Sequence, residues 1–355
     1  MSLKRRDFVK GFALLSSIAG LGPLSMRGAS KPAMASAGKQ TALPTALGSG
    51  ARIGIASPAS GVTKSELRGF IAVCESLGFT PVIGRNVNHR DGYLSAPDQA
   101  RADEFMAFIE DPTIDAIVCA RGGYGVMRIL PMLDYGSIGQ AKKVIMGFSD
   151  ITSLLIAANQ LSNIVTYHGP VATSTFDRFT LDSFNQTVVD AGFSGETVIS
   201  SNNTDTVWSF TDDRLTTIHA GHARGRLTGG NLAMIVATLG TEYEIDTTGA
   251  ILFLEEINEE PYRIDRMLTQ LWLAGKLQAC AGIAIGNFRN CEAKGISISG
   301  PSFSLTEVLQ ERTRDLGVPV IYGLPVGHVK SKLTMPVGMP AELDASSKTI
   351  RVLTA

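Results

Sequence analysis

The chain has 355 residues, of which 44% are hydrophobic, so it can bury one large core or two smaller ones, and an intrinsically disordered protein is excluded. Its 32 Lys and Arg residues balance 33 Asp and Glu residues, and no run of five basic residues occurs. This charge pattern excludes a nucleic-acid-binding protein, which needs clustered positive charge against the phosphate backbone.

Residues 1–37 have the pattern of an export signal. Arg5 and Arg6 precede a weakly hydrophobic stretch over 11–24, and the small residues 35–37 form a cleavage-site pattern. The hydrophobic stretch contains Gly, Ser and Pro and is shorter than the roughly 20 residues needed to span a bilayer. The segment therefore resembles a twin-arginine signal and predicts a periplasmic protein without a stable membrane anchor.

The four cysteines do not form a disulfide or metal-binding pattern. Cys74, Cys119 and Cys280 lie in apolar runs, where a free Cys behaves as a small hydrophobic residue. We expect these three to be buried thiols. Only Cys280 and Cys291 are close enough in sequence to suggest a bridge, which is the alternative.

From residue 52 onward, short apolar runs alternate with helical patterns. Strands are expected at 53–56, 80–83, 116–120 and 143–146, and helices at 64–77, 96–109, after Tyr124 and at 150–160. Apolar strands separated by helices indicate a parallel sheet that is buried on both faces. This half therefore predicts a doubly wound α/β domain.

A polar stretch over 173–217 separates this half from one with a different pattern. There we expect a helix that opens at 229–231, a strand at 250–254, a helix at 261–274, a strand at 283–286 and short strands over 318–353. The predicted organisation is a signal peptide (1–37), a linker (38–51), an N-terminal α/β nucleophile domain (52–172), a junction (173–222) and a smaller β-rich C-terminal domain (223–355) that carries a Glu and a His.

Ser149 lies where a buried strand runs into Gly-x-Ser and then directly into a helix. Such a turn pushes the hydroxyl out at the carboxyl end of the sheet, which suits a nucleophile. Ile151 replaces the second Gly of the usual Gly-x-Ser-x-Gly pattern, and Ser is also a common helix N-cap, so a purely structural role is the alternative.

A second glycine-rich turn, at residues 119–125, also follows a strand. Adjacent glycines allow backbone N–H groups to approach a ligand closely, and an oxyanion needs two such donors. One possible pair is an N–H group of this turn, at Gly123, with that of Asp150. A nucleotide phosphate loop is the alternative, but the turn has neither the Lys of a P-loop nor the spacing of a dinucleotide-binding motif.

Two further positions could complete a hydrolytic site. Glu255 directly follows a buried run and is expected to be partly buried, as a carboxylate that orients a His must be. His328 lies between glycine and proline turn residues that would hold its ring. The sequence has no HExxH motif, so neither a metal nor another cofactor is expected.

Five motifs together resemble a known family. They are GGYG at 122–125, GFSDIT at 147–152, GGNL at 229–232, LFLEExxExPYxIDRML at 252–268 and GHV at 327–329. Their order is similar to that of the L,D-carboxypeptidases, or muramoyltetrapeptide carboxypeptidases, of the S66 serine peptidase family, over about residues 52–353.

The resemblance implies a nucleophile, Ser149, a general base, His328, and an orienting carboxylate, Glu255. Many members have Glu-Asp where this chain has two glutamates, so Glu256 competes for the last role. The resemblance also implies a Rossmann-like or amidotransferase-like N-terminal domain, a β-rich C-terminal domain, a homodimer, and a peptidoglycan peptide as substrate, from which terminal D-Ala is released.

Three other functions remain open from the sequence. The first is a microcin C-type immunity peptidase of the same fold, which hydrolyses aminoacyl-nucleotides. The second is a periplasmic solute-binding module, because two α/β lobes and an export signal also describe that class. The third, a NAD enzyme, is disfavoured because the glycine fingerprint is missing.

Overall fold

The computed structural model describes residues 41–189, 197–200, 208–209, 215–294 and 301–353. The expected export signal, 1–37, lies outside the described residues, as does the start of the expected linker. None of the helices in the described part combines the length and the apolar character that crossing a bilayer requires.

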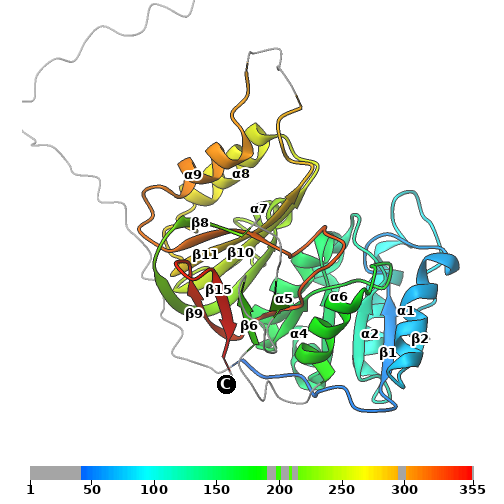
Figure 1. The fold of residues 1–355 in the computed structure, drawn as a ribbon. Coiled ribbons are helices and arrows are strands. Elements are labelled where there is room, and N and C mark those ends of the chain that lie inside the picture. The colour runs from blue at the N-terminus through cyan, green and yellow to red at the C-terminus, as the bar shows by residue number, and fades with distance from the viewer. Residues whose placement is uncertain (1–40, 190–196, 201–207, 210–214, 295–300, 354–355) are drawn as a thin grey trace, which may run out of the picture. The chain divides into compact units, whose positions relative to one another are not determined.

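The first half of the chain, together with β13 from the C-terminal region, builds a six-stranded sheet in the order β13-β5-β4-β3-β1-β2. Figure 1 labels the neighbouring strands β1 and β2 of this sheet. All neighbouring strands are parallel except β13, which runs antiparallel to β5. The strands are β1 (Arg52–Ala56), β2 (Thr80–Ile83), β3 (Ala116–Cys119), β4 (Val144–Gly147), β5 (Thr166–His168) and β13 (Met335–Val337). The helices are α1 (Lys64–Ser76), α2 (Asp98–Glu110), α3 (Val126–Ile129), α4 (Tyr135–Ala141) and α5 (Thr152–Ser162), with the 3₁₀ turns η1 (Leu130–Met132) and η2 (Ser149–Ile151).

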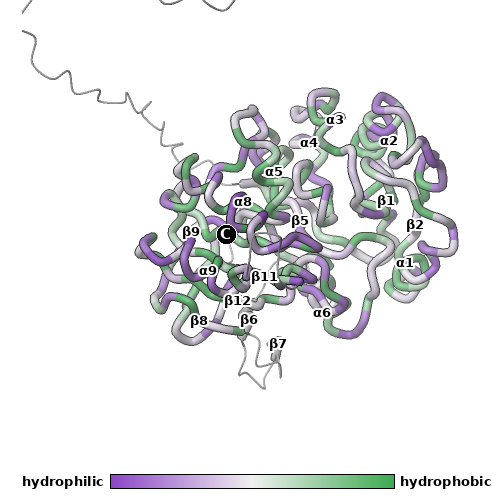
Figure 2. The backbone as a smooth tube through the Cα atoms, turned by 90° about the horizontal axis from the view of Figure 1, so that it is seen from above, coloured by the Kyte–Doolittle hydropathy of each residue, from purple (hydrophilic) through white to green (hydrophobic). Residues whose placement is uncertain are grey.

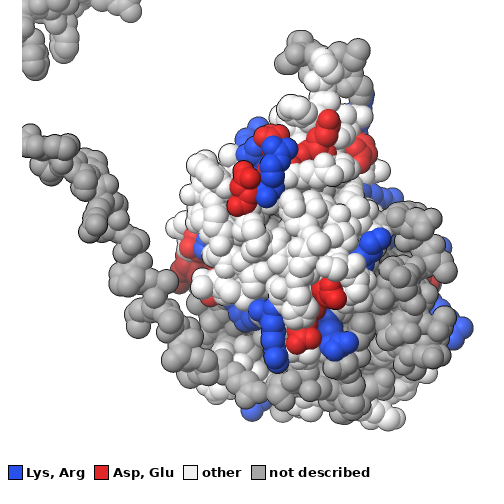
Figure 3. All heavy atoms as spheres, turned by 60° about the vertical axis from the view of Figure 1, so that its left-hand side comes forward, with Lys and Arg blue, Asp and Glu red and all other residues white. Residues whose placement is uncertain are grey.

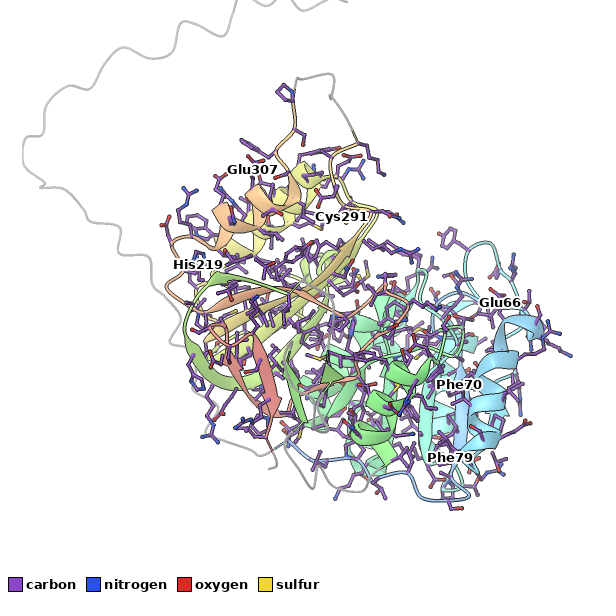
Figure 4. The ribbon with its side chains drawn as sticks, in the orientation of Figure 1. Glu66, Phe70, Phe79, His219, Cys291 and Glu307 are labelled. Atoms are coloured by element: carbon purple, nitrogen blue, oxygen red, sulfur yellow. The ribbon has the colours of Figure 1, made fainter. Side chains whose placement is uncertain are left out.

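Helices cover both faces of this sheet, as its apolar strands require. Successive residues of a strand point to opposite faces, and in β3 Val118 packs in the core cluster that contains Phe70 of α1. Cys119 packs in the opposite cluster, which α2, α4 and α5 complete. Figure 4 labels Phe70, and Figure 2 shows α5 as a mostly hydrophobic segment. The expected parallel sheet is therefore confirmed.

The second half builds a nine-stranded mixed sheet in the order β7-β6-β15-β14-β9-β10-β11-β12-β8. Its strands are β6 (Thr197–Ser200), β7 (Trp208–Ser209), β8 (Thr216–His219), β9 (His222–Asn231), β10 (Ala250–Ile257), β11 (Gly282–Arg289), β12 (Val320–Leu324), β14 (Pro340–Asp344) and β15 (Thr349–Val352). The helices are α7 (Leu232–Ala237), α8 (Pro261–Leu273) and α9 (Leu305–Thr313). Helices α8 and α9 lie side by side over one face of the curled sheet (Figure 1). The predicted fold class, an α/β domain with a smaller β-rich domain, is confirmed.

The chain passes between the two sheets more than once. After β5 it forms α6 (Arg178–Phe184) and the π-helical turn η3 (Asn185–Val189) before it enters the second sheet. Near the C-terminus it returns, because β13 pairs with β5 of the first sheet before β14 rejoins the second. The domain limits drawn from the sequence stay a prediction, and β13 is a part of the C-terminal region that lies in the N-terminal sheet.

Some elements were not expected from the sequence. Strand β9 runs through the glycine pair 229–230 to Asn231, where the sequence indicated only a helix start. Asn231 does cap α7, because its side chain accepts the N–H of Met234. Helix α9 begins at a capping box formed by Ser304 and Glu307. This signal is local and could have been found.

All four cysteines are free and buried, so the alternative bridge between Cys280 and Cys291 is not formed. Burial raises the pKa of Cys291 to about 11 and that of Cys280 to about 12. The thiols are therefore protonated at neutral pH, and the expectation of buried thiols is confirmed for Cys74, Cys119 and Cys280. Figure 4 labels Cys291.

The face drawn in Figure 3 carries Lys and Arg side chains interspersed with Asp and Glu among its described residues. This mixture agrees with the near-balance of charge in the sequence.

Candidate functional site

The predicted strand-to-helix turn at Ser149 is present. Strand β4 ends at Gly147, and Ser149 takes a left-handed backbone conformation, with a φ of 65°, before η2 and α5 begin. Such a conformation is strained for a residue with a side chain and typically costs about 1–2 kcal/mol. A Cβ atom at Gly147 would lie 2.8 Å from Cγ2 of Ile151, so glycine is required there. Phe148 and Ile151 occupy the N-cap positions of η2 and α5, so the alternative in which Ser149 caps the helix is wrong.

The glycine-rich turn after β3 lies against Ser149. A Cβ atom on Gly122 would come within 2.9 Å of the Ser149 hydroxyl, so only glycine allows this approach. The buried Asp150 carboxylate accepts the N–H of Val126 at 2.9 Å and thereby ties the two turns together. Burial raises the pKa of Asp150, against that hydrogen bond. The N–H of Gly123 makes no backbone hydrogen bond to the described residues and is free to donate to a ligand.

His328 and Glu255 form a buried pair. His328 follows β12, Glu255 lies in β10, and Nδ1 of His328 is 2.7 Å from Oε2 of Glu255. Glu255 has no exposed surface, and the His328 side chain is 16% exposed. Gly327 makes the approach possible, since a Cβ atom there would lie 2.1 Å from the same carboxylate oxygen, and its φ is 87°. The Glu255 carboxylate can therefore fix both the orientation and the tautomer of His328.

Glu256 faces away from His328, because successive residues of a strand point to opposite sides. Its carboxylate accepts hydrogen bonds from the Nδ2 of Asn231 at 3.1 Å and from the N–H of Ala233 at 2.8 Å. Glu256 thus holds the first turn of α7 at the end of β9. Burial raises the pKa of this carboxyl group.

Phe148 brings the serine turn and the histidine together. Its ring meets the His328 ring edge-on, with 4.9 Å between centroids. The Ser149 hydroxyl makes no hydrogen bond to His328 or any other described residue. Catalytic hydrogen bonds are often long before substrate binds, so this geometry is compatible with a serine–histidine pair.

A second histidine, His168 at the end of β5, was not expected at the site. Its Nε2 lies 3.9 Å from Oε1 of Glu255, and neither buried atom has a hydrogen-bond partner in the described part of the chain. The rings of Phe148 and Phe253 pack edge-on against it. Burial lowers the pKa of His168 to about 4, although Glu255 opposes the shift.

This low pKa predicts that acid weakens the fold through His168. An unfolded chain takes up the proton near pH 6.5, whereas the folded chain excludes it until near pH 4, so the free energy of unfolding falls between these values. We expect His168 to contribute a loss of about 2 kcal/mol between about pH 7 and about pH 5.

Urea unfolding of the wild type and of His168→Gln at both pH values measures this loss. The variant should lack that part of the pH dependence, and His89→Gln, at an exposed site, should keep it. An equal loss of unfolding free energy between the two pH values in the wild type and in His168→Gln would contradict the prediction.

A cavity of about 830 Å³ opens beside the Glu255–His328 pair. Phe148 and His328 form one part of its wall, and hydroxyl groups such as those of Thr173 and Ser174 form another. This volume lies in the range of small-molecule sites. Within the described residues, no group of three His, Cys, Asp or Glu side chains is close enough to hold a metal ion.

The chain matches two family models. Residues 53–169 match the LD-carboxypeptidase N-terminal domain, and residues 224–343 match the LD-carboxypeptidase C-terminal domain. It is also 34% identical over 309 residues to the probable murein peptide carboxypeptidase of Bacillus subtilis, an alignment that covers 86% of this chain and 92% of the relative. The chain belongs to the LD-carboxypeptidase family, peptidase S66. The family predicted from the motifs is therefore confirmed.

Two other relatives of this chain bear on its function. The crystal structure of a muramoyltetrapeptide carboxypeptidase from Oxalobacter formigenes is 31% identical, with a TM-score of 0.72 over 85% of this chain and 97% of that chain. The microcin C7 self-immunity protein MccF of Escherichia coli is 27% identical over 315 residues, 83% of this chain and 90% of the relative. Family membership argues against a solute-binding module.

Sequence reasoning missed several residues of the candidate site. Gly122, rather than its neighbour Gly123, contacts the serine, and His168 lies against Glu255. Arg289 and Lys332 line the cavity, and no local signal in the sequence marks either of them.

Proposed function

We propose that this chain is a serine L,D-carboxypeptidase that releases terminal D-Ala from murein tetrapeptide stems. The observation that carries the proposal is the buried Glu255–His328 pair, packed through Phe148 against the strained turn of Ser149. A family that includes murein peptide carboxypeptidases supports the substrate class.

In the proposed mechanism the Ser149 Oγ attacks the scissile carbonyl carbon while Nε2 of His328 takes the hydroxyl proton. Glu255 accepts the hydrogen bond from Nδ1–H of His328 and stabilises the resulting imidazolium. The N–H groups of Gly123 and Asp150 donate to the oxyanion. When the tetrahedral intermediate collapses, His328 returns the proton to the departing D-Ala amine. Water then hydrolyses the acyl-enzyme by the same route.

Incubation of the purified chain with murein tetrapeptide tests the proposal. We expect free D-Ala and the tripeptide to appear together in equal amounts. An aminoacyl-nucleotide is the matched control, because MccF is among the relatives. Hydrolysis of the nucleotide without release of D-Ala would favour an immunity-type activity instead.

For the export signal we propose that Arg5 and Arg6 direct the protein to the periplasm through the twin-arginine route. The Arg pair ahead of the hydrophobic stretch 11–24 supports this. Replacing both arginines by Lys keeps the charge and removes the guanidinium forks. We expect this double variant to stay unprocessed in the cytoplasm, while wild-type protein in the periplasmic fraction begins near Gly38. Wild-type protein found in the cytoplasm with an intact N-terminus would contradict the proposal.

We also propose a homodimer, as the family resemblance implies. Sedimentation equilibrium should then give twice the mass of one chain. A single-chain mass at micromolar concentration would contradict it.

A further inference from the structure

The charged side chains in the wall of the cavity beside His328 are all cationic among the described residues. Its lining includes three cationic side chains, Arg289, Lys330 and Lys332, and no Asp or Glu among the residues that the structure describes. The remaining polar lining groups are hydroxyls, the Asn287 amide and His328. Such a wall suits an anionic group of a ligand.

Lys332 differs from the other two cations because it is buried. Its residue is 4% exposed, whereas Lys330 and Arg289 lie at the surface. Within the described part of the chain, its ammonium group makes no hydrogen bond or ion pair and lies 5.2 Å from the centre of the Phe148 ring. A buried ammonium without a partner is costly, so its retention at a cavity wall indicates a ligand that supplies the counter-charge.

The charge state of Lys332 allows this role. Burial lowers its pKa to about 8, Asp177 and Glu255 favour the charged form, and Arg289 opposes it. Lys332 is therefore mostly protonated at neutral pH. Asp177 is itself engaged, because it accepts hydrogen bonds from Ser331 and from the N–H of Thr180.

The position of Lys332 selects one carboxylate of the substrate. His328 and Lys332 both lie against the ring of Phe148, the residue before Ser149. His328 must reach the amine of the departing amino acid. In an amino acid only one carbon separates the amine from the carboxylate, so this carboxylate is the anion of the substrate nearest to His328.

We propose that Lys332 binds the C-terminal carboxylate of the substrate and so restricts this enzyme to removal of a single terminal residue. Arg289, which donates to the backbone carbonyl of His328 at 3.2 Å, stands at the outer edge of the same wall. The inference rests on the proposed function, because it assigns the cation that a carboxypeptidase requires.

Binding measurements separate this inference from the hydrolysis. The proteins are Ser149→Ala, which cannot form an acyl-enzyme, and Ser149→Ala combined with Lys332→Met. The ligands are the murein tetrapeptide that ends in D-Ala and the same peptide that ends in D-alaninamide. Titration calorimetry gives the dissociation constant of each pair.

With Lys332 present, the free acid should bind about 10- to 100-fold more tightly than the amide, because one charge-assisted hydrogen bond contributes an affinity difference of this size. With Lys332→Met, the two ligands should bind equally. Lys64→Met, at an exposed lysine of α1 outside the cavity lining, should keep the preference for the acid. The comparison of acid and amide on Ser149→Ala needs no change at Lys332, so it holds even where Lys332→Met fails to fold.

Equal binding of acid and amide to Ser149→Ala would overturn the inference, and so would a preference that survives Lys332→Met. If the wild type releases D-Ala but Ser149→Ala binds the acid and the amide equally, the proposed function stands and this inference fails. A clear preference that Lys332→Met abolishes, without any release of D-Ala by the wild type, would support the carboxylate site and reject the proposed function.

Discussion

Ser149→Ala is expected to lower the kcat for release of D-Ala by at least about a thousandfold, because removing a serine nucleophile leaves only binding and oxyanion stabilisation. The fold should be retained. The hydroxyl makes no hydrogen bond among the described residues, and Ala keeps the backbone conformation that Ser149 already has. Rates of D-Ala release, together with the unfolding temperature, check both parts.

Ser153→Ala is the matched control. Ser153 lies four residues further along, in α5, and its buried hydroxyl also lacks a partner in the described part. This variant should keep nearly the full rate. If Ser149→Ala retained more than about a tenth of the wild-type rate, the serine mechanism would be rejected.

Glu255→Gln and Glu256→Gln should separate two roles of neighbouring carboxylates. An amide at Glu255 can donate to Nδ1 of His328 and so favour the wrong tautomer, and we expect kcat to fall by about two to four decades. At Glu256 the change removes a charged acceptor of the Asn231 and Ala233 N–H groups. That should lower the free energy of unfolding by about 1–3 kcal/mol, with a much smaller effect on kcat.

Steady-state kinetics and urea unfolding of the two variants measure these effects side by side. A larger loss of kcat at Glu256 than at Glu255 would reassign the orienting carboxylate. An unchanged free energy of unfolding in Glu256→Gln would show that Glu256 does not hold α7 in place.

The sequence predicted the first sheet well because its signals are local. Strands β1, β3 and β4 are short, continuous apolar runs, and such runs are buried on both faces wherever helices follow them. The turn at Ser149 was visible for the same reason, since a strand, a Gly-x-Ser and a helix are adjacent in the chain.

The remaining features depend on contacts between distant segments. Two consecutive glutamates differ only in the face they occupy, and the sequence does not say which face meets His328. Lys330 and Lys332 are both lysines, yet one is exposed and the other is a buried part of the cavity wall. His168 is separated from Glu255 by 87 positions of mostly unrelated pattern, so nothing local reveals their proximity.

The way the chain returns to its first sheet has a consequence for biosynthesis. Ser149 and its proposed partner His328 are 179 residues apart in the sequence, and strand β13, which completes the first sheet, follows His328. A polypeptide that stops short of His328 therefore carries the proposed nucleophile without its proposed base. Under the proposed mechanism, such a polypeptide is expected to have no hydrolytic activity.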